Sequence, residues 1–374
     1  MGTLFQFPYR SVAEVSVRSI IKNLVTLRSL SQREIVPVVK ADAYGHGILP
    51  VSRALVTRGS CHTLCVATLE EAIELRKKIP YAISIWVLSG FLPHQLEAYL
   101  KYHLTPVIHS LNHLKSLLYH KRLPEIHLKL DTGMRRLGLL PEEMAEAYLT
   151  LERLGIKLSG FATHFAESEN SVSKFVDEQI AIFHGVYQEL LHRRLIQTDA
   201  SIHIANTGAV LRKKIGLSYS VRPGIGLYGI SPNPRLSSCE ALVPALSWKA
   251  RVLSVKSLNP LDTVGYGRSY KAKRREKIAI ISIGYADGLP RLLSNEGNVI
   301  MGGRKASIRG QVSMDLTTVD CTSIPSVKEG SLVTLIGKEG KQTVTAWDIA
   351  NWARTIPYEI LCGISPRVPR IYLD

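Results

Sequence analysis

Residues 38–47 read V-V-K-A-D-A-Y-G-H-G, in which an apolar β-branched run meets a lysine and then a polar turn with two glycines. Such a run predicts a buried strand, here over residues 34–40. A lysine at the mouth of so apolar a strand is partly desolvated, which favours a neutral, nucleophilic amine. Taken alone, Lys40 is better explained as a solvated residue at a strand end. A role as a nucleophile therefore depends on evidence from the rest of the sequence.

Seven further strand-like runs follow this one, and segments with the apolar spacing of an amphipathic helix separate them. The predicted strands are 34–40, 62–68, 82–89, 104–109, 125–131, 158–165, 201–206 and 219–227. The predicted helices include 69–78, 93–102, 141–154 and 174–194. Eight strand–helix units in roughly 250 residues predict a closed (β/α)₈ barrel of the TIM type. A doubly wound open sheet is the alternative, but no G-x-G-x-x-G turn follows the first strand.

The pattern changes after about Val243, where helical spacing nearly disappears and short strand runs separated by glycine take over. The predicted strands there are 250–255, 278–283, 306–308 and 332–336, with one late helix at 346–354. We therefore expect an α/β protein in which a barrel domain, 1–243, precedes a mostly-β domain, 244–374. The first ten or so residues are expected to pair with the second domain.

Composition excludes several classes of protein. The chain of 374 residues has 45% hydrophobic and 21% charged residues, which is typical of neither a disordered polyelectrolyte nor an integral membrane protein. We expect no secretory leader, and the sequence contains no apolar run of the ~20 residues that span a membrane. Five scattered cysteines do not form a disulfide framework. We expect a cytoplasmic protein with no membrane partner.

The net charge of +16 raises the question of nucleic acid. The densest basic run, Lys271–Lys277, lies between two strand-like segments, as an exposed loop does, and no nucleic-acid-binding motif accompanies it. We expect no nucleic-acid partner. The sequence Cys61-His62-x-x-Cys65 falls within a buried strand pattern and supplies too few ligands for zinc, so no metal site is expected.

The other predicted strand ends carry a set of polar residues that argues for a phosphorylated cofactor. They supply D-T-G-M-R-R at 131–136, T-H-F at 163–165, H-I-A-N-T-G at 203–208 and R-P-G-I-G at 222–226. Strand ends converge on one rim of a barrel, so a lysine, two arginines, a histidine and an asparagine would meet there. A hydroxyl followed by glycine, together with a Gly-Ile-Gly loop, offers the N–H groups that cradle a phosphate.

These motifs resemble those of the alanine racemases, which belong to the fold-type III pyridoxal-phosphate enzymes. The resemblance begins with V-V-K-A-D-A-Y-G-H-G and spans essentially the whole chain in order. It continues through H-L-K-L-D-T-G-M-x-R-L-G, T-H-F, H-I-A-N, R-P-G-I, V-G-Y-G, I-G-Y-A-D-G, S-M-D at 313–315 and the C-terminal R-V-P-R.

The resemblance implies pyridoxal 5'-phosphate as cofactor, alanine as substrate and a two-base racemisation. Lys40 would be the Schiff-base lysine and the base on the face of the D-isomer, and Tyr266 the base on the face of the L-isomer. A phenol is a weak base at neutral pH, so its site has to stabilise the phenolate. Arg222 would face the pyridine nitrogen, which stays unprotonated because a guanidinium accepts no proton. His164 would support Arg222.

The resemblance also assigns the remaining contacts. Arg136 and the backbone of Met314 would hold the substrate carboxylate, and Tyr285 would narrow the entrance. Lys129 would be carbamylated and would orient Arg136. The cofactor, and chiefly its phosphate, would be bound by Tyr44, Asn206, Thr207, Gly224, Ile225 and Tyr358. The family's head-to-tail homodimers bring Tyr266, Tyr285 and Met314 into the partner's barrel, and their product, D-alanine, supplies peptidoglycan synthesis.

Three departures from the family pattern are visible: Ser313 replaces a frequent cysteine, Thr207-Gly208 replaces Ser-Ala, and Arg135 occupies a variable position. None touches the expected bases. Three alternatives stay open. A basic amino-acid decarboxylase would carry a carboxylate facing the pyridine nitrogen, where Arg222 stands. A racemase with broader or shifted specificity, for example for serine, is the second. The third is a non-catalytic pyridoxal-phosphate carrier, although small carriers lack the second domain.

Overall fold

The chain divides after Val243 into two units, each with its own hydrophobic core. One unit is Ser19–Val243. The other is Pro244–Asp374 together with the described part of Met1–Arg18. This computed structural model describes residues 8–374, without the side chains of residues 237 and 239. The expectation that the first ten residues pair with the second domain falls mostly outside the described residues. The strand that does so is β1 (Ser11–Ser16).

Eight short parallel strands form the centre of the unit Ser19–Val243. Six of them, β3 to β8, pair in chain order in one sheet, and β2 pairs with β9. Their bounds are β2 (Glu34–Ile35), β3 (Thr63–Val66), β4 (Ser84–Val87), β5 (Thr105–Ile108), β6 (His127–Lys129), β7 (Leu158–Ala162), β8 (Ile196–His203) and β9 (Ser220–Val221). Each lies within or overlaps a strand predicted from the sequence.

Backbone hydrogen bonds close these strands into a ring. Beyond β2, the Val39 N–H donates to the Cys65 carbonyl of β3 at 2.8 Å. At the other junction, the Tyr219 N–H donates to Ile202 of β8 and the Arg222 N–H to Ala205, both at 2.9 Å. The predicted barrel is therefore confirmed as a curled, closed parallel sheet, and the open doubly wound sheet is excluded.

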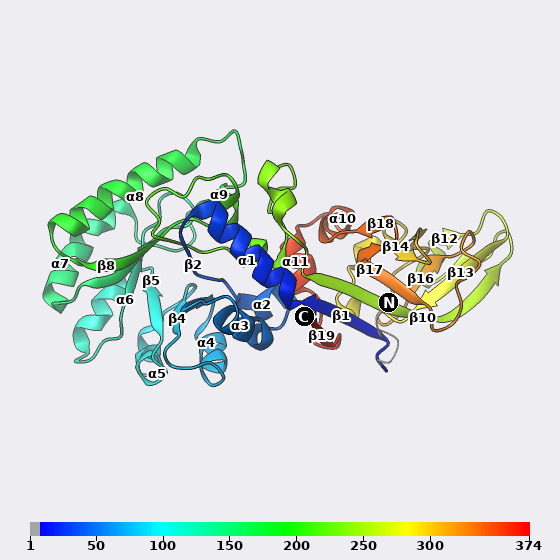
Figure 1. The fold of residues 1–374 in the computed structure, drawn as a ribbon, viewed down its shortest axis with the longest axis horizontal. Coiled ribbons are helices and arrows are strands. Elements are labelled where there is room, and N and C mark those ends of the chain that lie inside the picture. The colour runs from blue at the N-terminus through cyan, green and yellow to red at the C-terminus, as the bar shows by residue number, and fades with distance from the viewer. Residues whose placement is uncertain (1–7) are drawn as a thin grey trace. The chain divides into compact units, whose positions relative to one another are not determined.

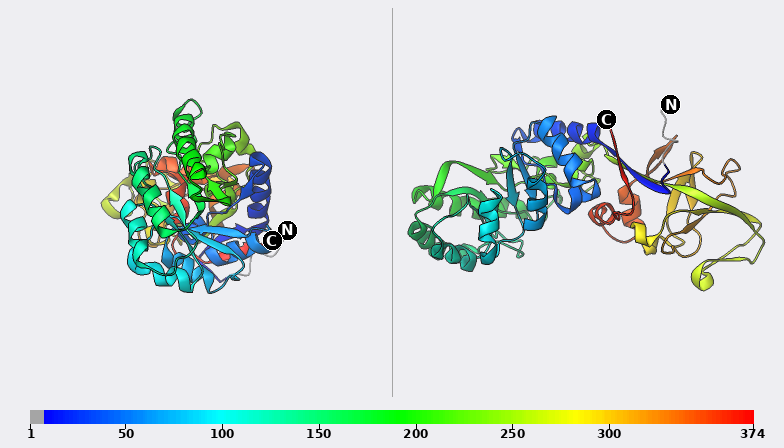
Figure 2. Two further views of the ribbon diagram at one scale, coloured as in Figure 1. Left: turned by 90° about the vertical axis from the view of Figure 1, so that its left-hand side faces the viewer. Right: turned by 90° about the horizontal axis from the view of Figure 1, so that it is seen from below.

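Helices cover the outside of this sheet (Figures 1 and 2). Their bounds are α1 (Val17–Ser31), α3 (Ile48–Thr57), α4 (Leu69–Arg76), α5 (Leu96–Lys101), α6 (Leu111–Ser116), α7 (Met144–Leu154), α8 (Phe175–His192) and α9 (Thr207–Leu211). The segment labelled α2 (Lys40–Gly45) is a short turn with left-handed backbone rather than an α-helix. α1 begins within the other unit and runs into this one. No helix in the described chain is long and apolar enough to cross a membrane.

The second unit is built on a nine-stranded sheet with the path β15-β14-β17-β10-β1-β19, and β13, β16 and β18 pair outside this path. The bounds are β10 (Leu246–Leu258), β11 (Thr263–Val264), β12 (Tyr270–Lys271), β13 (Glu276–Ile281), β14 (Asn298–Met301), β15 (Arg304–Ser307), β16 (Thr317–Asp320), β17 (Leu332–Glu339), β18 (Gln342–Val344) and β19 (Arg370–Leu373). Two helices, α10 (Ala346–Trp352) and α11 (Pro357–Cys362), follow β18. The mostly-β character predicted after Val243 is confirmed.

Candidate active site

The turn that begins at Lys40 has an unusual backbone. The four residues Ala41–Tyr44 all have φ between 52° and 54°, in the left-handed region that non-glycine residues enter at a cost of about 1–2 kcal/mol each. The carboxylate of Glu71, in the first turn of α4, accepts from the Ala41 N–H at 2.7 Å. Its other oxygen accepts from the N–H groups of Ala67 and Thr68 at 2.8 and 3.3 Å. The Glu71 carboxylate therefore ties the first residue of the strained turn to the start of α4, and strained backbone of this kind is common at functional sites.

The end of this turn meets the loop that follows β9. A Cβ on Gly224 would lie 2.2 Å from the Tyr44 hydroxyl oxygen, so only glycine fits there. The Thr207 hydroxyl accepts from the N–H groups of Gly224 and Gly226 at 3.2 and 3.3 Å. Two hydroxyls and a glycine-rich backbone thus meet in one corner, which is the composition of a phosphate site.

Asn206 stands beside that corner. Its side-chain oxygen caps α9 by accepting from the Ala209 N–H at 3.1 Å and also accepts from the Ser168 hydroxyl at 2.5 Å. Both bonds hold the loop that carries Thr207 and leave Asn206 with a supporting position in this structure.

Arg222 is buried and has no carboxylate among its hydrogen-bond partners. Its Nη2 donates to the Thr163 carbonyl at 2.9 Å, and its Nη1 donates to the His203 carbonyl and to His203 Nδ1, the latter at 2.7 Å. No described residue accepts from its Nε–H. Burial lowers the pKa of Arg222 to about 10. A buried guanidinium with neutral partners calls for an anion or a lone pair from a ligand.

Four of the cationic side chains from the predicted strand ends act on the charge state of one buried histidine, His164. The pKa of His164 lies well below its usual value, first because of burial and then because of Arg222, Lys129, Arg136 and Lys40. Burial lowers the pKa of Lys129 to about 8, and the same two arginines and Lys40 push it in the same direction. The hydrogen-bond partners of the Arg222 side chain are His203 and the Thr163 carbonyl rather than His164, whose carbonyl accepts from Gln179 of α8 at 3.1 Å.

Arg136 lies in a loop whose backbone is held by the carboxylate of Asp131. One oxygen of Asp131 accepts from the N–H groups of Gly133 and Arg135 at 2.8 and 3.1 Å. A Cβ on Gly138 would lie 2.6 Å from the Asp131 nitrogen, so the loop closes tightly at its far end. Arg136 is left exposed. It lines a cavity of about 300 Å³ together with His109, Asp131, Arg135, Leu137, Gly138 and Leu140.

Tyr266 lies in the other unit, at the tip of the β11–β12 hairpin. Gly265 and Gly267, both with φ of 69°, flank it and provide the turn. Its side chain is 74% exposed. The hairpin rests on a small apolar cluster of Leu258, Val264, Ala272 and Ile278. A rigid base with an exposed phenol at its tip is suited to reach into another surface.

Tyr285 and Met314 are neighbours in the same unit. The Tyr285 N–H donates to the Ser313 carbonyl and the Ala286 N–H to the Met314 carbonyl, both at 3.0 Å. A Cβ on Gly284 would lie 2.2 Å from the Ser313 carbonyl oxygen, which explains the glycine before Tyr285. The two side chains are 43% and 53% exposed.

A buried ion network fixes these two loops. Asp287 has no exposed surface and pairs with Arg10 and, at 3.6 Å, with Arg367. Arg367 also binds Asp315 at 2.6 Å. Three residues of the recognised motifs thus hold the loops of Tyr285 and Met314 rather than a ligand. They are Asp287 of I-G-Y-A-D-G, Asp315 of S-M-D and Arg367 of R-V-P-R. Tyr358 lies on α11, which packs in this same unit.

Sequence reasoning missed three residues. Glu71 lies at the start of the predicted helix 69–78 and no role was predicted for it, although its carboxylate holds the residue after Lys40. Asp287 lay inside a recognised motif without a role. His203 ended a recognised strand, but its partnership with Arg222 depends on how β8 and β9 lie side by side. Only the capping position of Glu71 had a local signal.

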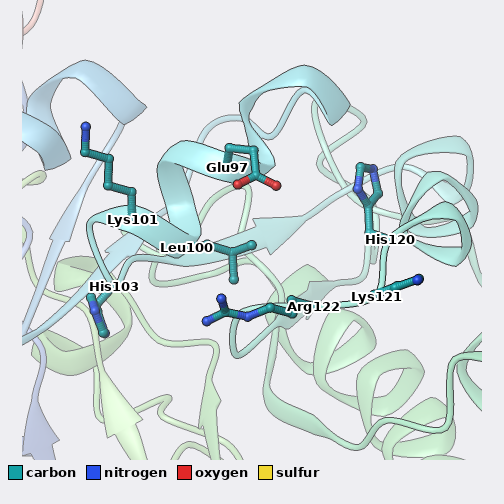
Figure 3. Close-up of a pocket in the computed structure, with 7 residues that line it drawn as sticks. All are labelled: Glu97, Leu100, Lys101, His103, His120, Lys121 and Arg122. Carbon is teal, nitrogen blue, oxygen red and sulfur yellow. The ribbon is translucent and has the colours of Figure 1, made fainter.

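A second cavity, of about 420 Å³, lies near the amino ends of β5 and β6 and is lined by Glu97, Leu100, Lys101, His103, His120, Lys121 and Arg122 (Figure 3). Lys101 and Lys121 point away from each other (Figure 3). The lining charged groups are exposed, and the cavity stands at the end of the strands opposite to the Lys40 site. In the part of the chain that the structure describes, no group of three or more acidic, histidine or cysteine side chains could hold a metal.

Comparison with known proteins agrees with this site. Residues 15–232 match the family "Alanine racemase, N-terminal domain" and residues 245–372 match "Alanine racemase, C-terminal domain". The alanine racemase of Halothermothrix orenii is 43% identical over 351 residues, which cover 91% of this chain and 90% of that protein. The alanine racemase of Carboxydothermus hydrogenoformans is 38% identical over 371 residues, 96% of this chain and 99% of that protein.

Solved structures agree as well. The Bacillus anthracis alanine racemase with bound L-Ala-P gives a TM-score of 0.90 at 30% identity and covers 98% of this chain and 96% of that one. The Bartonella henselae alanine racemase with covalently bound pyridoxal phosphate gives 0.88 at 31% identity, with coverage of 98% and 100%. The motifs, the two-unit fold and these matches lead to one conclusion: the chain belongs to the alanine racemase family.

Proposed function

We propose that this chain interconverts L- and D-alanine with pyridoxal 5'-phosphate held at the carboxyl ends of the barrel strands. The observation that carries this proposal is the convergence of Lys40, Lys129, Arg136 and Arg222 on His164. Such a concentration of cations calls for an anionic ligand. The family's activity, an isomerase reaction on alanine, is that of the full-length relatives at 34–43% identity.

The residues present fit this cofactor. The corner formed by Tyr44, Thr207 and Gly224 supplies hydroxyls and backbone for a phosphate, and a Cβ on Gly224 would fill it. The free Nε–H of Arg222 suits a pyridine nitrogen that keeps its lone pair. Lys40 begins the strained turn that contains Tyr44. We further assign Asn206, Ile225 and Tyr358 to phosphate binding and His164 to the support of Arg222.

Bound at Lys40, pyridoxal phosphate supplies an electron sink for the bond between the substrate's α-carbon and its hydrogen. The chain's own residues then move the proton. Lys40 Nζ exchanges it on the D face, and the Tyr266 phenolic oxygen exchanges it on the L face. Arg136 holds the substrate carboxylate with the Met314 backbone, and Tyr285 narrows the entrance and excludes larger side chains.

Arg222 limits how strongly the sink acts. A guanidinium only donates, so it leaves the pyridine nitrogen unprotonated and the electron sink moderate. By leaving that nitrogen unprotonated, Arg222 would disfavour long-lived carbanion character at the α-carbon and so suppress side reactions. A decarboxylase of this fold type requires a carboxylate where Arg222 stands, so the position favours racemisation.

Lys129 is proposed to carry a carbamate. Its pKa of about 8 leaves a usable fraction of neutral amine at neutral pH. The amine nitrogen forms a bond to the carbon of CO₂ and a proton is released, which turns a cation into an anion. Among Arg136, Arg222 and Lys40 an anion is favoured over a fourth cation. Intact-mass analysis under native conditions, with and without bicarbonate, would reveal the added CO₂; no adduct in either sample would remove the proposal.

We propose a head-to-tail homodimer in which Tyr266, Tyr285 and Met314 complete the barrel of the partner copy. Their exposure supports this, because large exposed side chains of this kind favour burial at an interface. Inactive Lys40→Ala and Tyr266→Phe variants should regain activity when mixed. No recovery after verified subunit exchange would contradict the dimer.

The product, D-alanine, would supply peptidoglycan synthesis, and the enzyme would act in the cytoplasm. The test of the reaction is proton NMR of L-alanine in deuterated water with the purified protein and pyridoxal phosphate, followed by a chiral assay. We expect the α-proton signal to disappear and D-alanine to form. Exchange with retained L configuration would remove Tyr266 as the second base. Exchange of serine but not alanine would move the specificity, and no exchange of any amino acid would leave a non-catalytic carrier.

A further inference from the structure

Two buried histidines stand behind Arg222 in the barrel. Nδ1 of His127 on β6 lies 2.9 Å from Nε2 of His203 on β8, and His203 Nδ1 lies 2.7 Å from Nη1 of Arg222. Both imidazoles are buried. The indole of Trp86 on β4 packs against both, with ring centroids 4.4 and 4.6 Å away. The side chains of His127, His203 and Arg222 therefore form one hydrogen-bond chain across the barrel interior.

The direction of this chain follows from its donor end. A guanidinium nitrogen can only donate, so His203 Nδ1 carries a lone pair and the proton of the neutral ring sits on Nε2. That Nε2–H points at His127 Nδ1, which must in turn be an acceptor. Each link fixes the tautomer of the next, as happens when the second nitrogen of a histidine is engaged.

Charges around the pair keep both rings neutral. Arg222 acts on both imidazoles and Lys129 acts on His203, and no carboxylate opposes them. Burial, followed by the field of Arg222, lowers the pKa of His127 to about 3 and that of His203 well below its usual range. Neither ring gains a proton near neutral pH, so the direction of the chain is stable.

We propose that His127 is a positioning residue: by accepting from His203 it fixes the tautomer through which His203 holds the guanidinium of Arg222 toward the cofactor's pyridine nitrogen. This inference rests on the proposed role of Arg222. Gly160 on β7 makes the arrangement possible, because a Cβ there would lie 2.5 Å from the His127 ring. A His203 ring without its acceptor could move its proton to Nδ1, where it would oppose the donor of Arg222.

The test compares His127→Phe, which keeps a ring but removes the acceptor, with His127→Asn, whose amide oxygen can take the place of Nδ1. The readout is the visible absorbance of the bound cofactor, titrated across the pH range in which each variant stays folded. Arg222→Gln serves as the reference for a pyridine nitrogen free to gain a proton. We expect His127→Phe to show the same new titration as Arg222→Gln and about tenfold lower kcat/KM, and His127→Asn to restore the wild-type titration.

The outcomes distinguish a failure of the proposed role of His127 from a failure of the proposed role of Arg222. If Arg222→Gln titrates and His127→Phe behaves as wild type, the role of His127 is overturned and that of Arg222 stands. If Arg222→Gln shows no new titration, the proposed role of Arg222 is overturned and the role of His127 with it. Gly160→Ala displaces His127 by another route and should reproduce His127→Phe, whereas Gly185→Ala, with open space around its Cβ, should not.

A direct measurement covers the case in which His127→Phe fails to fold. Nitrogen NMR of the wild-type protein, labelled at histidine, distinguishes a protonated imidazole nitrogen from a bare one. His127 and His203 should both carry hydrogen on Nε2 alone. A doubly protonated ring, or hydrogen on Nδ1 of either residue, would overturn the proposal whatever the variants do.

Discussion

The carboxylate of Glu71 accepts a 2.7 Å hydrogen bond from the backbone N–H of Ala41, the residue that follows Lys40. Its second oxygen caps the start of α4 through Ala67 and Thr68. One side chain therefore serves two tasks: it begins a helix and it holds the first residue of a left-handed turn. It acts together with the backbone hydrogen bonds from Ala43 to Val39 and from Gly47 to Asp42, which also hold the turn at positive φ values.

Glu71→Ala is expected to lower the free energy of unfolding by about 2 kcal/mol, since three N–H groups lose a charged acceptor. It should also weaken retention of pyridoxal phosphate, because the Lys40 turn relaxes. Urea denaturation and cofactor absorbance after dialysis measure the two effects. Glu70→Ala, one position earlier in the same helix, is the matched control. Loss of stability with unchanged cofactor retention would show that Glu71 acts on α4 alone.

Gly224→Ala should remove cofactor binding without unfolding the barrel. The new Cβ would meet the Tyr44 hydroxyl oxygen at 2.2 Å, and both groups belong to the proposed phosphate corner. We expect the apparent Kd for pyridoxal phosphate to rise at least about tenfold, the factor that corresponds to the loss of one good hydrogen bond to a charged group. Gly90→Ala is the control, because nothing lies within 4 Å of its added Cβ. Equal affinity in both variants would contradict the placement of the phosphate.

The sequence predicted the barrel because its strands are short, mostly apolar and separated by segments with helical spacing; β3 is buried throughout, and β4 is buried except for Ser84. It implied a helix between the first two strands, where α3 lies, but it did not predict the bounds of α1 or α3. Neither helix has an acidic residue in its first turn, and α3 follows Gly47 without a side-chain cap, so the usual start signals are absent. Turn residues Ala41–Tyr44 carry no signal for left-handed backbone, because tertiary contacts impose it.

Some residues of the candidate site could be predicted from the sequence and others could not. Residues with a motif at a strand end, such as Lys40 and Arg222, could be predicted because barrel strands present their carboxyl ends to one rim. Residues that act through a neighbour could not. His127 and His203 are 76 positions apart and meet only because β6 and β8 flank the same barrel interior. The spacing of the two residues along the sequence therefore does not predict that contact.

Asp287→Asn should disturb the loops of Tyr285 and Met314 without touching the barrel. Asp287 is fully buried between Arg10 and Arg367, so the change removes the charged partner of Arg10 and the weaker of the two partners of Arg367, which keeps Asp315. We expect the free energy of unfolding to fall by about 2 kcal/mol and KM for alanine to rise more than kcat falls. Asp320→Asn removes a partly exposed pair with Arg309 in the same unit and serves as the control. An unchanged KM would show that the network is only structural.

Lys129 gives a prediction with a definite pH window. Its folded-state pKa of about 8 lies below the ordinary value of 10.5, so the folded chain binds this proton less tightly than the unfolded chain. The charged lysine therefore costs stability below pH 8, and the cost disappears as the pH rises from 8 toward 10.5. Without CO₂ and cofactor, Lys129→Met should be more stable than wild type at pH 7, and the difference should shrink at pH 9. Urea denaturation at both pH values measures it, with the exposed Lys157→Met as control. A difference that stays constant, or that grows with pH, would contradict a buried cation at position 129.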